Sequence, residues 1–177
     1  MSQPASPTGQ DRSLLRARIL LRHPAGWLAT GLGVGMAARA PGTFGSIAAL
    51  APWLLLRELP FAGYLAAVAV TFALGVWASN WVIARTGVED PGVVVLDEFV
   101  GLWIALALAP PGWGWMLAGL LLFRVFDIAK PWPVSWADRR IKGGFGAMFD
   151  DALAGLYAFG VLQLAAWWLG HGGILPG

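Results

Sequence analysis

The sequence contains no cysteine, and its two histidines, His23 and His171, stand near opposite ends of the chain. The absence of cysteine excludes disulfides, thiolate nucleophiles and cysteine metal sites. Two histidines so far apart argue against a histidine phosphoenzyme and against a multi-histidine zinc site. A metal site in this chain would therefore be hard and rich in oxygen ligands.

Charge is also scarce. Only 12% of the 177 residues are charged and 58% are hydrophobic, whereas soluble domains carry about 25% charged residues. This composition favours a membrane protein. The net charge of +2 is small, so basic residues matter by position, and no nucleic-acid partner is expected. The 11 tryptophans, several near the ends of apolar runs, suit the bilayer interface or pack between helices.

Apolar runs broken by glycine and proline predict an all-α fold, a polytopic membrane helical bundle of four to five transmembrane helices. A single membrane-embedded catalytic domain is expected over residues 14–170, between a disordered tail at 1–13 and a short C-terminal tail at 171–177. Arginines interleaved with leucine over 12–22 indicate either an interfacial amphipathic helix or a solvated basic arm. Residues 24–40 are too short and too glycine-rich for a clear span, and could re-enter or lie on the membrane.

The clearest span is residues 62–84. One further apolar helix is expected to end at about Leu56, and Thr43 or Ser46 could cap its start. Other apolar helices are expected over 93–109, 113–128 and 147–169, and a basic loop or short helix over 134–146. Basic residues on cytoplasmic loops orient such a bundle. They place the starts of 93–109 and 147–169 and the end of 113–128 at the cytoplasmic face of the membrane.

The acidic residues are concentrated at these helix ends. Carboxylates cost roughly 2.5–3.5 kcal/mol near the centre of a membrane helix and less toward its ends, so their repetition indicates a function. Six of the ten acidic residues lie between Asp97 and Asp151: Asp97, Glu98, Asp127, Asp138, Asp150 and Asp151.

Carboxylates without histidine or cysteine suit Mg²⁺, which is usually bound by one or two carboxylates together with water and substrate phosphate. Arg124, Lys130 and Arg139 are candidates for holding phosphate oxygens. There are alternatives: Asp127 with Arg124 and Lys130 could be a structural ion pair, and Asp138 beside Arg139 a solvated loop pair.

Four blocks of sequence resemble the phosphatidylglycerophosphatase A family of bacterial membrane lipid phosphatases. They keep the order of that family over about residues 26–160. The blocks are Pro41-Gly42-Thr43-Phe44-Gly45-Ser46; Asp97-Glu98-Phe99-Val100-Gly101; Phe123-Arg124 through Asp127 to Lys130-Pro131-Trp132-Pro133; and Asp138-Arg139 followed by Gly143-Gly144, Gly146, Met148, Asp150-Asp151 and Ala154-Gly155.

The resemblance implies Mg²⁺-dependent hydrolysis of phosphatidylglycerophosphate to phosphatidylglycerol and phosphate, in phospholipid biosynthesis. The nucleophile, a metal-activated water or an aspartate, is left open, as are the number of metal ions and the oligomeric state. An ion-coupled transporter is the main alternative function; a phospholipid-making phosphotransferase and a non-catalytic scaffold are weaker ones. The expected catalytic and metal-binding residues are Asp97, Glu98, Asp127, Asp150 and Asp151, and the expected phosphate-binding residues are Thr43, Arg124, Lys130 and Arg139.

Overall fold

A computed structural model describes residues 20–89 and 91–171, and the secondary structure of this part of the chain is all-α, as the sequence predicts. The predicted tails and most of the 12–22 segment lie outside the described residues. The helices are α2 (Pro24–Ala29), the 3₁₀ helix η1 (Val34–Met36), α3 (Pro41–Leu56), α4 (Phe61–Thr86), α5 (Leu96–Ala105), α6 (Trp113–Ala129), α7 (Val134–Arg140) and α8 (Gly143–His171).

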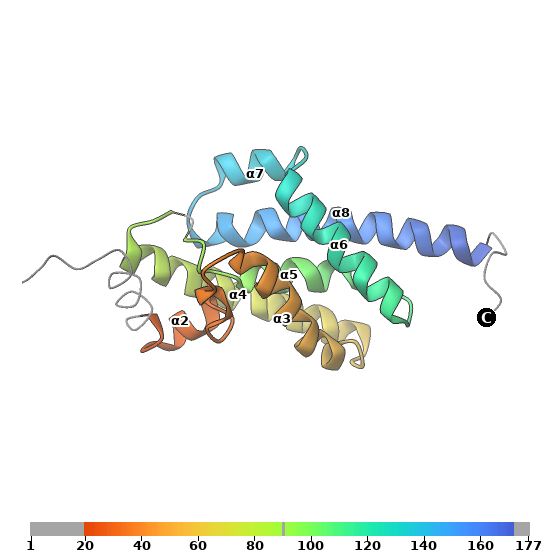
Figure 1. The fold of residues 1–177 in the computed structure, drawn as a ribbon, viewed down its shortest axis with the longest axis horizontal. Coiled ribbons are helices and arrows are strands. Elements are labelled where there is room, and N and C mark those ends of the chain that lie inside the picture. Colours follow the sequence, from red (N-terminus) through yellow and green to blue (C-terminus); the bar gives the residue numbers. More distant parts are fainter. Residues whose placement is uncertain (1–19, 90, 172–177) are drawn as a thin grey trace, which may run out of the picture.

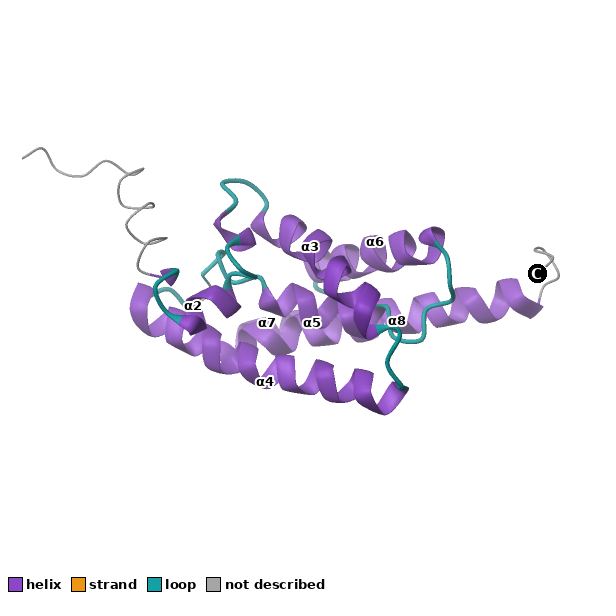
Figure 2. Cartoon of the chain, turned by 90° about the horizontal axis from the view of Figure 1, so that it is seen from below, coloured by secondary structure: helices purple, strands orange, loops and turns teal. Residues whose placement is uncertain are grey.

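Two long antiparallel helices, α4 and α8, follow the long axis of the molecule (Figures 1 and 2). The short helix α5 packs against both and against α3, while α6 crosses α8. Consequently the first turns of α5 and α8 and the last turn of α6 lie toward the same end of the molecule (Figure 1).

The core lies where α5, α6 and α8 meet. Its largest fully buried side chains include Leu102 from α5, Leu106 directly after that helix, Phe123 from α6, and Met148 and Leu162 from α8. Unlike this core, the two long helices expose much of their apolar surface. The most apolar stretch of α4 is only 17% buried within the protein, and that of α8 only 28%. A helix that is apolar on its exposed face favours contact with lipid.

Two helices in the described residues, α4 and α8, are long and apolar enough to cross a membrane. These two candidates are fewer than the four to five spans that the sequence predicts. At about 1.5 Å per residue, the ten residues of α5 reach only about 15 Å, half of the roughly 30 Å hydrocarbon core. The run predicted over 93–109 is cut short because Val95 and Leu106 leave helical geometry.

The Pro41–Ser46 block does not interrupt the chain but forms the first turns of α3. Pro41 occupies the first helical turn, where a missing N–H costs little, and Ala40 precedes it with φ 47°. Neither Thr43 nor Ser46 is the cap, which corrects the expectation from sequence; the Ser46 hydroxyl instead donates to the Gly42 carbonyl at 2.8 Å. Pro52 lies inside α3 without ending it.

Residues 24–40 form α2 and η1, two pieces too short to span. Helix α2 buries Ala25 and Ala29 and packs against α4. The basic segment 134–146 contains α7, and α8 begins within it at Gly143.

Candidate metal and phosphate site

Helices α5 and α8 cross with their backbones in contact, and this crossing brings the acidic residues together. A Cβ added to Gly155 would collide with the Gly101 carbonyl oxygen, and one added to Gly101 would lie 2.8 Å from the Asp151 carbonyl oxygen. Only glycine allows so close an approach. The first turn of α5 therefore faces Asp151 directly.

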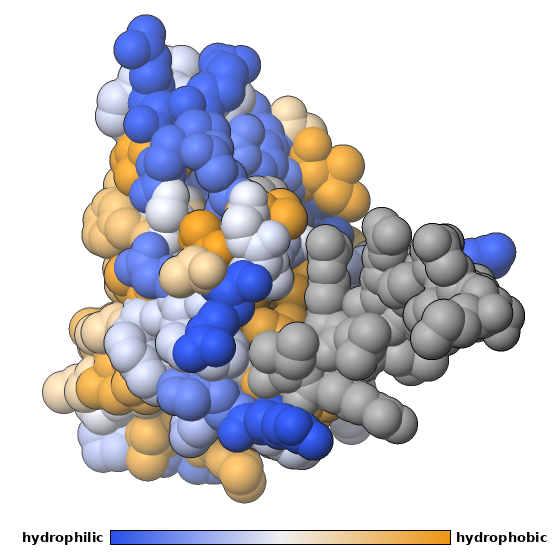
Figure 3. All heavy atoms as spheres, turned by 90° about the vertical axis from the view of Figure 1, so that its left-hand side faces the viewer, coloured by the Kyte–Doolittle hydropathy of each residue, from blue (hydrophilic) through white to orange (hydrophobic). Residues whose placement is uncertain are grey.

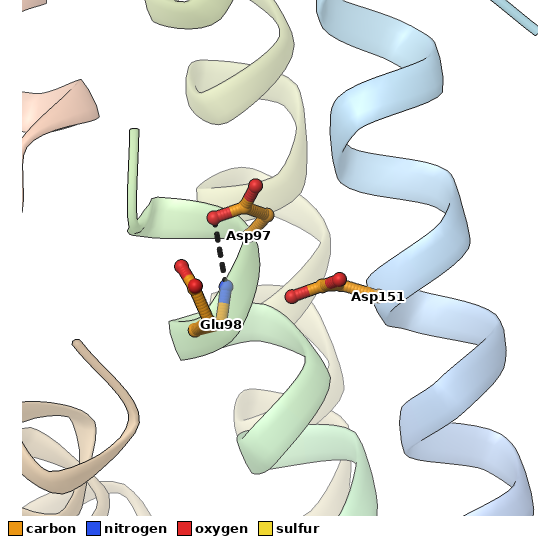
Figure 4. A group of neighbouring side chains, drawn as sticks. All are labelled: Asp97, Glu98 and Asp151. Atoms are coloured by element: carbon orange, nitrogen blue, oxygen red, sulfur yellow. Dashed lines mark hydrogen bonds between the residues drawn. The ribbon is translucent and has the colours of Figure 1, made fainter. Parts of the chain in front are cut away.

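Asp97, Glu98 and Asp151 form a compact carboxylate cluster. One oxygen from each lies within 4.8 Å of the others, and Figure 4 shows the α8 side chain pointing toward the two from α5. Asp97 Oδ1 accepts a hydrogen bond from the Glu98 amide at 3.0 Å. Glu98 and Asp151 are buried.

Burial and mutual repulsion disfavour ionisation of the two carboxyls on α5. Burial, then the neighbouring charge of Glu98, raises the pKa of Asp97 well above its usual value. Burial raises the pKa of Glu98 to about 7, against the lowering effect of its hydrogen bond with Asp97. The charges of Asp151 and Asp127 raise this pKa further, and Arg124 lowers it. A cation placed among these oxygens would relieve that repulsion.

Arg124 and Asp127 stand beside this cluster on α6. Arg124 Nη1 donates to Asp127 Oδ2 at 2.6 Å and lies 3.9 Å from Glu98 Oε1. The first turn of α3 covers the contact, because a Cβ on Gly42 would collide with Glu98 Oε1. Of the ion pair that the sequence offered as an alternative, the contact of Asp127 with Arg124 is thus present within the site, whereas Lys130 pairs with other carboxylates.

Lys130 holds two further carboxylates. Its Nζ lies 2.5 Å from Asp138 Oδ1 and 2.7 Å from Asp150 Oδ2. Burial by itself lowers the pKa of Lys130, but the two hydrogen-bonded carboxylates outweigh burial and raise it. Asp138 therefore pairs with Lys130 and not with its neighbour Arg139, which corrects the loop pair considered from sequence.

These side chains surround one cavity of about 520 Å³. Arg139, Lys142 and Glu89 line it together with the acidic residues. Hydrophilic residues gather on one part of the end of the molecule that Figure 3 faces, and α7 lies toward that end in Figure 1. The lining includes eight of the nine residues predicted for the site: Asp97, Glu98, Asp127, Asp150, Asp151, Arg124, Lys130 and Arg139.

Thr43 is the exception. It is exposed and does not line the cavity, whereas its neighbours Pro41 and Gly42 do. Conversely, Glu89 and Lys142 line the cavity without having been singled out by the sequence. In the sequence, the only indication that Lys142 would line the cavity is its place in the basic segment 134–146. No feature of the sequence indicated this for Glu89.

The donors present fit a divalent metal ion. Glu98 Oε2 and Asp150 Oδ1 are buried without a hydrogen-bond partner, and such orphaned carboxylate oxygens are costly unless something binds them. Asp97, Glu98 and Asp151 offer the oxygen ligands that Mg²⁺ prefers. Asp127 and Asp150, by contrast, are already engaged by Arg124 and Lys130.

The all-helical fold, the exposed apolar faces of α4 and α8 and the acidic cavity flanked by arginine fit a membrane-associated enzyme that acts on phosphate groups. The family model for phosphatidylglycerophosphatase A matches residues 27–166. The chain belongs to the phosphatidylglycerophosphatase A family and is a phosphatase.

Relatives support this family over most of the chain. Phosphatidylglycerophosphatase A of Escherichia coli K12 is 38% identical over 92% of this chain and 92% of the relative. The protein of the same name from Haemophilus influenzae is 42% identical, over 86% and 94% respectively. A Bacteroides thetaiotaomicron protein, provisionally named a phosphatidylinositol-3-phosphatase, is 43% identical over 81% and 94%. No solved structure matches, and nothing in these comparisons supports an ion-coupled transporter.

Proposed function

We propose that this protein hydrolyses phosphatidylglycerophosphate to phosphatidylglycerol and phosphate, in a reaction that depends on Mg²⁺. The family and two of the relatives carry the name of this activity. The observation that carries the metal requirement is the cluster of Asp97, Glu98 and Asp151 oxygens within 4.8 Å of one another.

Asp97, Glu98 and Asp151 would hold the ion. When bound, Mg²⁺ draws charge from phosphoryl oxygens and lowers the pKa of water. In the hydrolysis, the oxygen of a water molecule bonds to phosphorus, the bond from phosphorus to the glycerol oxygen breaks, and the proton that the water loses ends on that glycerol oxygen. Such a transfer needs mainly positioning and charge stabilisation, which the surrounding side chains supply.

The cationic residues divide into two kinds. Arg124 and Lys130 neutralise Asp127 and Asp150, and so keep those carboxylates fixed at the wall of the cavity. Arg139 lines the same cavity, and a guanidinium can take phosphate oxygens in a bidentate manner. We assign it to the terminal phosphate.

The cavity would face the cytoplasm in a bacterial inner membrane. Lys130, Arg139 and Lys142 line it, and Arg85 lies in the last turn of α4, at the same end of the molecule (Figure 1). Basic residues favour the cytoplasmic side. A lipid headgroup at that interface could reach the cavity while its acyl chains contact the exposed apolar faces of α4 and α8.

The test is phosphate release by the purified protein from phosphatidylglycerophosphate, phosphatidic acid and phosphatidylinositol 3-phosphate, with Mg²⁺ or with EDTA. We expect release from the first substrate, its loss in EDTA, and its loss in Asp151→Asn by about 10³-fold or more, since the metal supplies several kcal/mol of transition-state stabilisation. Glu58→Gln is the control, because Glu58 is exposed in the turn before α4.

Release that persists in EDTA would reject the metal requirement. Release only from phosphatidylinositol 3-phosphate would reject the substrate and favour the activity named for the Bacteroides relative.

A further inference from the structure

Lys142 is a cation at the rim of the cavity that the other side chains hold less tightly than they hold Arg124 and Lys130. Four cationic side chains line the cavity in the described residues: Arg124, Lys130, Arg139 and Lys142. Arg124 and Lys130 make carboxylate contacts of 2.7 Å or less. The Lys142 ammonium lies 3.8 Å from Glu89 Oε2 and 3.4 Å from the Asp138 carbonyl oxygen.

These long contacts are weak. The side chains of Lys142 and Glu89 are 58% and 74% exposed, and an ion pair so open to solvent contributes little. Lys142 directly precedes α8 and Glu89 lies in the segment between α4 and α5, so the pair joins two separate segments at the rim. An anion that enters the cavity can replace Glu89 as the partner of Lys142 at small cost.

The proposed substrate carries two phosphate groups, a terminal monoester and an internal diester separated by one glycerol. If the monoester reaches Asp97, Glu98 and Asp151 in the buried part of the site, the diester lies one glycerol closer to the lipid and thus to the rim. Phosphatidic acid has only the monoester, and cannot occupy both positions.

We infer that Lys142 binds the internal phosphodiester and makes the enzyme prefer a lipid with two phosphates. This inference rests on the proposed function. Charge-assisted hydrogen bonds to phosphate oxygens are short and strong, so the ammonium gains by exchanging Glu89 for the diester. Glu89 has the opposite effect, because its carboxylate competes for Lys142 and repels the incoming diester.

The experiment compares kcat and KM of Lys142→Met on phosphatidylglycerophosphate and on phosphatidic acid in mixed micelles with Mg²⁺. Loss of one charge-assisted hydrogen bond should raise KM about tenfold for the first substrate, with kcat nearly unchanged. Values for phosphatidic acid should not change. Lys142→Arg should restore most of the affinity, and Glu89→Gln should lower KM for the first substrate alone.

Arg140→Met is the matched control. Arg140 is exposed, two positions before Lys142, and does not line the cavity, so this variant removes the same charge from the same surface without touching the rim. An equal loss on both substrates, or no greater loss than in Arg140→Met, would overturn the role of Lys142. Wild-type protein that releases phosphate from neither substrate would overturn the proposed function, and the inference with it.

Discussion

Lys130→Met offers a direct test of how the site is held together. The substitution keeps much of the apolar stem but removes the ammonium that lies 2.7 Å from Asp150 and 2.5 Å from Asp138. The Asp150 side chain is 9% exposed and that of Asp138 is 38% exposed. Asp150 would therefore become a buried charge without a counter-ion, while water would largely replace the partner of Asp138.

The expected cost follows from these exposures. Removing one partner of a fully buried ion pair costs about 3–5 kcal/mol. Because the Lys130 side chain is 30% exposed, water can solvate part of the uncompensated charge and lower this cost. We therefore expect a destabilisation of about 2 kcal/mol. In a chain of this size that corresponds to a fall in Tm of roughly 4–8 °C.

Thermal unfolding of the detergent-purified, metal-free protein measures the effect. Asp150→Asn in the Lys130→Met background should recover at least half of the loss, because the uncompensated charge is gone. Arg140→Met, which removes an exposed charge, should shift Tm by little. If Lys130→Met lowered Tm no more than this control does, or if Asp150→Asn recovered none of the lost Tm, the ion pairs of Lys130 with Asp138 and Asp150 would not contribute to stability.

Three further outcomes are expected. Glu98 has a pKa of about 7 in the folded protein against 4.5 for an exposed glutamate, so burying its charge costs about 3 kcal/mol above pH 7 and nothing below about pH 4.5. Thermal melts of metal-free protein should therefore show higher stability at pH 5 than at pH 8, and Mg²⁺ should reduce the difference. Gly155→Ala should destabilise by about 1–3 kcal/mol and reduce phosphatase activity, whereas Gly160→Ala, which meets nothing within 4 Å, should unfold no more easily than wild type. Thr43→Val should keep KM within about twofold, because the exposed hydroxyl lies outside the cavity, and should change the free energy of unfolding as little as other surface substitutions do. A tenfold rise in KM would show instead that Thr43 contacts the substrate.

The helical class and the long helices were predictable from local pattern. The span expected over 62–84 is α4, Phe61–Thr86, and the helix expected over 113–128 is α6, Trp113–Ala129. The number of spans was not, because hydropathy marks apolar runs but does not say where a backbone leaves helical geometry. Val95 and Leu106 do so, and α5 is too short to cross.

The sequence by itself determined that acidic helix ends would meet at one cavity and to which family the chain belongs. Composition, the order of the motifs and the charge of the loops carry that information locally. Only the tertiary structure decided how the acids divide: Asp97, Glu98 and Asp151 gather in one carboxylate cluster, while Asp127 and Asp150 form short ion pairs with Arg124 and Lys130. That division depends on the contact of Gly101 with Gly155 and on the turn at Lys130, whose φ of 43° begins the path to α7 and Asp138. Both depend on how distant segments pack, which residue spacing along the chain cannot specify.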